Sequence, residues 1–218
     1  MKDLKRWGAV AAIAVVAIIP VQIAIFALRP PPADVRGFFE LFERSSLLGL
    51  LSLDLLYLLN NALMISVYLG LAACLYKANQ SAIITALAVG LVGLATYYAS
   101  SVAFEMMSLA KSFNGSSNPL LRQQLLAAGE GMLATYKGTA FDVYYILNAI
   151  TLFIFSWVML KERERTFTRT TALWGLASAA LMIISSTAGT IGLIFSLLSL
   201  VPWVVFSILI AGRMRKSQ

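Results

Sequence analysis

The sequence contains no histidine and a single cysteine, and charged residues make up only 12% of its 218 residues. Without histidine the chain lacks the commonest general base and the usual nitrogen ligand of zinc, which excludes histidine-based catalysis and argues against an ordinary zinc site. The lone Cys74 excludes an intrachain disulfide, and we expect it to pack between helices. A soluble domain carries about 25% charged residues, so the composition argues against one.

Familiar functional motifs are missing as well. The sequence holds no Walker loop, GxGxxG, HExxH or GxSxG pattern. It also lacks the serial arginines of a voltage sensor and a TVGYG-like selectivity filter. The sequence therefore defines no catalytic residue and points to no particular cofactor.

Apolar residues are abundant instead, at 60% with a mean hydropathy of +0.82. They gather in long runs, and a helix needs about 20 apolar residues to cross a bilayer. We therefore predict an all-α transmembrane bundle of about six spans that forms a single membrane domain over residues 1–218, with the lipid bilayer as its surroundings. The predicted spans are 7–28, 47–76, 82–104, 139–160, 170–187 and 191–211.

The positive charges predict how the bundle is oriented. The net charge is +7, and eleven of the seventeen basic residues fall in the four short segments 1–7, 77–80, 161–169 and 212–218. Cytoplasmic loops carry such an excess of Lys and Arg, so we expect both termini to lie in the cytoplasm. No basic surface is left over for nucleic acid.

The two longer connections, which this orientation places outside, are predicted to contain surface helices. Asn118 and Pro119 read as an N-cap followed by proline at the first helical position. Apolar side chains then recur at helical spacing, which predicts an amphipathic helix lying on the outer surface. The segment 32–44 is similar, with three phenylalanines on a short helix. The apolar positions are Leu121, Leu125, Ala128, Met132 and Tyr136 in the later segment, and Phe38, Phe39 and Phe42 in the earlier one.

A short motif occurs twice. Asp54-Leu-Leu-Tyr57-Leu-Leu-Asn60 opens one predicted span, and Asp142-Val-Tyr-Tyr145-Ile-Leu-Asn148 opens another. A predicted surface helix precedes each copy, and both copies run inward from the outer side. The pattern indicates a duplicated unit of a surface helix and two spans. Repeats in membrane proteins often place a ligand site at their interface.

Helical spacing gathers polar side chains into one candidate site. Each copy of the motif places its Asp, Tyr and Asn on an arc of about 120°. Tyr98, Ser101 and Glu105 are predicted to share a face of the third span. The candidate ligand-binding residues are Asp54, Tyr57, Asn60, Asn61, Tyr98, Ser101, Glu105, Asp142, Tyr145, Asn148, Ser185 and Ser186.

These residues allow a functional and a structural interpretation. A carboxylate inside a span costs about 2.5–3.5 kcal/mol, so three acids at similar depth favour a polar cavity in the outer half of the membrane. The same Asn, Ser and Tyr side chains also hold transmembrane helices together by hydrogen bonds. Basic residues nearby, if paired with the acids, favour the structural interpretation; these are Arg36, Arg44, Arg122 and Lys137.

The chain resembles a family of bacterial six-span membrane proteins whose function is unknown. The resemblance rests on the segments 53–61 and 139–148 around the two motifs, on Ala103-Phe-Glu105-Met and on Ser186-Thr-Ala-Gly189-Thr-Ile-Gly192, and it runs from the second span to the sixth. It implies the six-span fold and a bacterial or archaeal inner membrane. It implies no activity.

Three functions remain open. The first is a bundle that binds or transports a cation or a small polar solute through the acidic site. The second is a structural or regulatory membrane subunit without a ligand. The third is an intramembrane lipid-modifying enzyme in which Asp54 and Asp142 act as acid and base or bind a metal through oxygen alone. The absence of catalytic motifs favours a protein that is not an enzyme.

Overall fold

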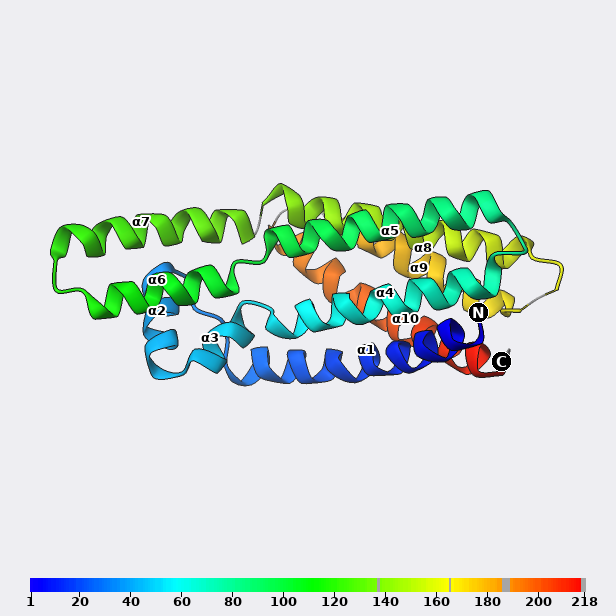
Figure 1. Ribbon diagram of the computed structural model, residues 1–218, viewed down its shortest axis with the longest axis horizontal. Helices are drawn as coiled ribbons and strands as arrows, with labels where there is room; N and C mark the ends of the chain where they lie inside the picture. The colour runs from blue at the N-terminus through cyan, green and yellow to red at the C-terminus, as the bar shows by residue number, and fades with distance from the viewer. Residues whose placement is uncertain (137, 165, 186–188, 217–218) are drawn as a thin grey trace.

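The computed structural model describes residues 1–136, 138–164, 166–185 and 189–216, and within them the chain is helical without a strand. Six long helices form a bundle, and four others gather at one end of it (Figure 1). The long helices are α1 (Lys2–Leu28), α4 (Leu55–Leu75), α5 (Gln80–Ser100), α8 (Thr139–Lys161), α9 (Arg169–Ser185) and α10 (Gly189–Lys216). The four at the end are α2 (Val35–Arg44), α3 (Ser46–Ser52), α6 (Ala103–Gly115) and α7 (Pro119–Tyr136). Three of them are shorter than every helix of the bundle, and α7, with 18 residues, is one residue longer than α9.

Length and composition make this a bundle of membrane type. Among the described residues, five helical stretches are long and apolar enough to cross a bilayer, and they contain α1, α4, α5, α8 and most of α10. The apolar helix α9 has 17 residues, or about 26 Å of helix, close to the roughly 30 Å of a hydrocarbon core.

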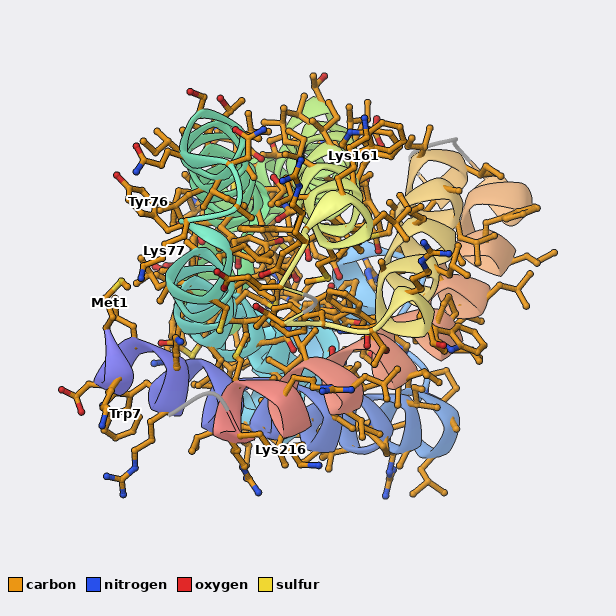
Figure 2. The ribbon with its side chains drawn as sticks, turned by 90° about the vertical axis from the view of Figure 1, so that its right-hand side faces the viewer. Met1, Trp7, Tyr76, Lys77, Lys161 and Lys216 are labelled. Atoms are coloured by element: carbon orange, nitrogen blue, oxygen red, sulfur yellow. The ribbon has the colours of Figure 1, made fainter. Side chains whose placement is uncertain are left out.

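The six long helices form a closed ring. The order around the ring is α1, α4, α5, α8, α9 and α10, and α10 packs again on α1. Successive helices run in opposite directions, so the labelled N and C ends lie at the same end of the bundle (Figure 1). Figure 2 shows the bundle from that end, with Met1, Lys77, Lys161 and Lys216 on the side that faces the viewer.

The exterior of the ring is apolar on every helix. Large apolar side chains that would be buried in a soluble protein are exposed here, as expected where a helix meets lipid rather than water. They include Ile13, Val21, Leu59, Ile65, Leu91, Val92, Ile150, Phe153, Leu173, Leu198 and Ile208. The chain is therefore an all-α, multi-pass membrane protein.

Small residues bring α1 and α4 into close contact. A Cβ atom built on Gly8 would lie 2.8 Å from the Cα atom of Gly70 and 2.9 Å from the carbonyl oxygen of Ser66. Both neighbours are backbone atoms, which cannot rotate away. Gly8 and Gly70 therefore set the distance between these helices, in the manner of small residues in other membrane bundles.

The second span differs from the sequence prediction, which made 47–76 one continuous helix. Helix α3 ends at Ser52, and α4 begins at Leu55. Between them Asp54 has φ 62° and ψ 31°, in the left-handed region, and it is the one non-glycine residue with positive φ among the described residues. Asp is among the residues that tolerate this conformation, so the chain turns at the first residue of the repeated motif.

The other four helices build a second hydrophobic core at the end opposite the termini. Phe38, Phe39 and Phe42 of α2 are buried, as the pattern in 32–44 predicts. They join Met106 and Phe113 of α6 in one cluster, with apolar residues of α7 packed against it. These helices therefore cover one another, and we refer to α2, α3, α6 and α7 as the end cap.

Helix α7 is not the flat surface helix that the sequence predicted. Its start is as expected, because the Asn118 side chain accepts hydrogen bonds from the backbone N–H groups of Leu120 and Leu121 at 3.0 and 3.4 Å. However, α7 runs beside α6 along the long axis of the molecule and extends past the six-helix ring (Figure 1). Its apolar side chains Leu125 and Met132 pack on the core of the end cap, which provides the partner that the amphipathic pattern could not identify.

Candidate functional site

A cavity lies inside the ring and is lined from all six long helices. It offers about 70 Å³ to the centre of a water-sized molecule, which is room for several waters or a small solute. Its walls include Ile19 of α1, Tyr57, Asn60, Met64 and Tyr68 of α4, Leu94 of α5, Tyr144, Tyr145 and Asn148 of α8, Ser178 and Met182 of α9, and Ser196, Ser199 and Trp203 of α10.

The two copies of the repeated motif meet at this cavity. Tyr57 and Asn60 from the first copy and Tyr145 and Asn148 from the second all line it. Their spacing of three residues places each pair on one face of its helix, and the ring turns both faces inward. Four of the twelve candidate residues thus line the same cavity, although the first pair and the second pair are more than 80 positions apart in the sequence.

Hydrogen bonds fix part of the cavity wall. The Tyr68 hydroxyl donates to Oδ1 of Asn148 at 2.5 Å, and Nδ2 of Asn148 donates to the carbonyl of Tyr144 at 2.9 Å. The hydroxyls of Tyr145 and Ser196 lie 3.1 Å apart, which joins α8 to α10. Asn148 and Tyr145 are therefore held in place by neighbouring helices.

Other polar atoms in the wall have no partner. Oδ1 of Asn60 and Oγ of Ser178 are buried without a hydrogen bond among the described residues. Asn60 is 7% exposed and Ser178 is fully buried, and both line the cavity from different helices. Buried polar groups are nearly always satisfied by protein or by an ordered molecule. The wall of the cavity thus contains two polar residues, Asn60 and Ser178, whose hydrogen-bonding capacity the described residues do not use up.

Asn61 is a second buried amide on α4. Its side chain is fully buried, and neither polar atom has a hydrogen-bond partner among the described residues. The Tyr144 hydroxyl approaches it without reaching hydrogen-bonding geometry. Asn61 does not line the cavity wall, so it lies behind the site rather than in it.

A cluster of tyrosines surrounds the carboxyl group of Asp54. The hydroxyl of Tyr136, the last residue of α7, donates a hydrogen bond to Oδ2 of Asp54. Tyr57 follows Asp54 by one turn of α4, and its backbone N–H donates to the carbonyl of Asp54 at 2.9 Å. Because Tyr57 lines the cavity and Asp54 does not, Asp54 stands next to the part of the wall that Tyr57 forms.

The rings of this cluster pack at steep angles. Tyr97 and Tyr144 have centroids 4.9 Å apart with planes at 58°, and Tyr144 and Tyr145 have centroids 5.2 Å apart with planes at 78°. The ring centroids of Tyr57 and Tyr97 lie 6.3 Å apart. Tilted pairs of this kind are the favoured aromatic geometry, and they form adjoining walls rather than a parallel stack.

The three acids predicted as one site do not converge. Glu105 is exposed on α6, in the end cap. Asp142 is half-buried in the first turn of α8 and makes no hydrogen bond or ion pair with the part of the chain that the structure describes. No group of three or more Cys, Asp or Glu side chains in the described ranges is arranged to hold a metal ion. None of the three acids lines the cavity itself.

The predicted face of Tyr98, Ser101 and Glu105 is wrong, because the helix does not continue through it. Helix α5 ends at Ser100, and α6 starts at Ala103 after a change of direction at Ser101. Tyr98 is 39% exposed, and its hydroxyl donates to the carbonyl of Leu58 at 3.1 Å. It fastens α5 to α4 on the outside of the ring.

The remaining candidates are serines at the end of α9. Oγ of Ser185 donates to the carbonyl of Leu181 in its own helix at 2.9 Å, which is a local bond rather than a contact with the site. Ser186 and Lys137, a proposed partner of the acids, lie outside the described residues. Arg122 stacks on Phe113 at 3.9 Å in the end cap, not on an acid.

Sequence reasoning missed several residues of the site. Tyr68, Tyr144, Ser178, Ser196 and Trp203 line the cavity but carry no repeated pattern. Tyr136 was identified only as an apolar position of α7, yet it binds Asp54. Tyr144 stands inside the second copy of the motif and Tyr68 lies about two helical turns beyond the first, so a search for aromatic residues within and just beyond each motif would have found both. Nothing in the sequence indicates which face of α9 or α10 turns inward.

The fold and the cavity together define the class of protein, a multi-pass helical membrane bundle with a polar, aromatic-lined interior site. Comparison with family models, with curated proteins and with solved structures gives no match for this chain. The site must therefore be interpreted from its own chemistry.

Proposed function

We propose that this protein binds a small polar solute in its central cavity, within a cell membrane. The observation that carries the proposal is the convergence of both copies of the repeated motif on one cavity, to which Tyr57 and Asn60 come from the first copy and Tyr145 and Asn148 from the second.

The position of the site also fits solute binding. The cavity is lined from all six helices at the centre of the ring, where a ligand is shielded from lipid. We further propose that the end carrying Lys77, Lys161 and Lys216 faces the cytoplasm of a bacterial inner membrane, because that end holds most of the basic residues. The end cap then lies on the outer side. The likeness to a bacterial six-span family is consistent with this arrangement and remains a prediction.

A structural subunit without a ligand is the second candidate. It is supported by the hydrogen bonds that join helices across the interior, such as Tyr68 to Asn148 and Thr151 Oγ1 to the carbonyl of Ala86 at 3.3 Å. A lipid-modifying enzyme is less well supported, because Asp54 binds Tyr136 and no group of three or more acids among the described residues is arranged to hold a metal ion.

The test is a stability screen of the purified protein against classes of solute: inorganic cations, neutral polyols and amides, amino acids and organic amines. A ligand that binds only the folded state at a hundredfold excess over its Kd adds about 2.7 kcal/mol, which appears as a rise in Tm. We expect at least one class to raise the Tm of the wild type.

Matched variants locate the binding. Ser178→Leu and Ser199→Leu place bulk in the cavity, whereas Ala177→Leu adds similar bulk to an exposed position of α9. The stabilisation should disappear in the two serine variants and persist in Ala177→Leu. If no class stabilises the wild type, or if the cavity-filling variants respond like the wild type, the structural subunit becomes the better account.

A further inference from the structure

The walls of the central cavity are unusually aromatic for a polar site. Tyr57, Tyr68, Tyr144, Tyr145 and Trp203 all line it. The face of an aromatic ring carries partial negative charge and attracts cations, most strongly for Trp and then Tyr. Since Tyr144 and Tyr145 stand at 78° to each other, the cavity offers ring surfaces from more than one direction.

Among the described residues, an acid lies next to one wall of the cavity. Asp54 accepts a hydrogen bond from the Tyr136 hydroxyl, and its carbonyl accepts one at 2.9 Å from the backbone N–H of Tyr57, which lines the cavity. Within the described ranges no Lys or Arg forms an ion pair with Asp54, and none lines the cavity. A carboxylate in such surroundings lowers the energy of a cation in the cavity and raises that of an anion.

The other wall groups decide which kind of cation fits. A hard metal ion such as Mg²⁺ or Ca²⁺ takes six or more oxygen ligands, and the described acids do not gather around the cavity. Rings and the thioethers of Met64 and Met182 make much of the wall, and these groups do not replace the hydration shell of a small ion. An alkylated ammonium ion suits them, because it spreads its charge over methyl or methylene groups that pack on rings.

We propose that the solute bound in the central cavity is a small organic ammonium ion, held against the tyrosine and tryptophan faces with the Asp54 carboxylate behind the wall as its counter-charge. This proposal rests on the proposed function, because it names the ligand class for the same cavity. The polar residues of the wall, which include Asn60 and Ser199, provide hydrogen-bonding groups for a hydroxyl or N–H elsewhere on the ligand. The repeated motif thus supplies aromatic faces from both copies but a counter-charge from only the first.

The test compares choline with 3,3-dimethylbutan-1-ol, its neutral carbon analogue of nearly the same shape, as ligands of the purified full-length protein. Binding is measured by isothermal titration and by the shift in Tm. We expect choline to bind and the neutral analogue to bind at least about tenfold more weakly, because only choline gains from the rings and the carboxylate.

Two pairs of variants assign the interaction to residues. Asp54→Asn should weaken choline binding by about tenfold or more, whereas Asp142→Asn, which changes the same residue of the other motif copy, should leave it unchanged. Tyr145→Phe keeps the ring face and should retain binding, whereas Tyr145→Leu removes it and should lose binding. Tyr98→Leu on the outside of the ring is the control. The Tyr145 pair keeps the test decisive if Asp54→Asn fails to fold.

The outcomes separate this proposal from the function on which it rests. Equal binding of choline and the neutral analogue would overturn the charge recognition and leave solute binding intact. Failure of choline together with stabilisation by another solute class would do the same. If nothing in the wider screen stabilises the protein, both proposals fail.

Discussion

The Tyr68 hydroxyl reaches across the interior of the ring to Oδ1 of Asn148, at 2.5 Å. These residues stand on α4 and α8, which α5 separates in the order of the ring and which touch each other only over a small area. The bond therefore links two helices whose main packing partners are other helices. It ties the second copy of the repeated motif to the helix that carries the first.

Removing this bond should destabilise the bundle without changing its shape. We expect Tyr68→Phe to lower the free energy of unfolding by about 1 kcal/mol, since Oδ1 of Asn148 then loses its partner. Tyr76→Phe makes the same chemical change at an exposed position at the other end of α4 and should have little effect. Thermal unfolding in detergent measures both. Equal effects of the two variants would contradict the importance of this bond.

The contact between α1 and α4 gives a steric prediction. Gly70→Ala should destabilise by about 1–3 kcal/mol, because its Cβ would meet the Cα atom of Gly8 at 2.9 Å. Gly212→Ala in α10 is the matched control, since nothing lies within 4 Å of the added atom. There the change should be neutral or stabilising by about 0.5–1 kcal/mol, as alanine favours a helix. A stable Gly70→Ala protein would show that the two helices are further apart than described here.

The backbone at Asp54 can be tested separately from its charge. Asp54→Gly and Asp54→Ala both remove the acceptor for Tyr136, but only glycine adopts a φ of 62° without strain. We expect the glycine variant to be more stable than the alanine variant by about 1 kcal/mol. The reverse order, in the same thermal assay, would mean that the chain at Asp54 continues as helix.

The end cap should unfold without opening the ring. Phe39 is fully buried in its core, and Phe39→Ala should cost about 3–5 kcal/mol there. Hydrogen exchange measured by mass spectrometry should then rise in α2, α6 and α7 and stay low in α5 and α9. Phe104→Ala, at a side chain that is 53% exposed, is the control and should leave exchange unchanged. Faster exchange throughout the protein would show that the two cores fold as one unit.

Cysteine labelling tests the orientation. In a Cys74→Ala background, a cysteine at Ser117 in the end cap and one at Ala78 between α4 and α5 lie in exposed turns at opposite ends of the molecule. A membrane-impermeant reagent should label position 117 in intact cells, and position 78 only after the membrane is opened. The opposite pattern would invert the proposed orientation.

Hydropathy was enough to predict the class of fold. The long apolar runs predicted the all-α bundle of membrane type that the structure has, because lipid leaves the backbone few alternatives to a helix. The breaks were harder to predict. Leu53 and Asp54 interrupt an apolar run without Gly or Pro, and only the left-handed backbone at Asp54 reveals the turn.

The candidate site was predicted in part, and the reason is geometric. Periodicity places Tyr57 beside Asn60 and Tyr145 beside Asn148, so the repeated motif located four residues of the cavity wall. Periodicity alone could not show that α5 ends at Ser100 and that Glu105 belongs to the next helix, α6. Nor could it tell that Asp142 stays apart from the cluster around Asp54, because that depends on how each helix is rotated in the ring.

The ring also determines when the site exists during synthesis. Each of the long helices from α4 to α10 packs on the one made before it, but α1 gains its second neighbour only when α10 arrives. Trp203, Ser196 and Ser199 come with that last helix. Until then the side chains of the cavity face an open seam between α1 and α9. A nascent chain that stalls after α9 therefore has most of its membrane helices but an incomplete cavity.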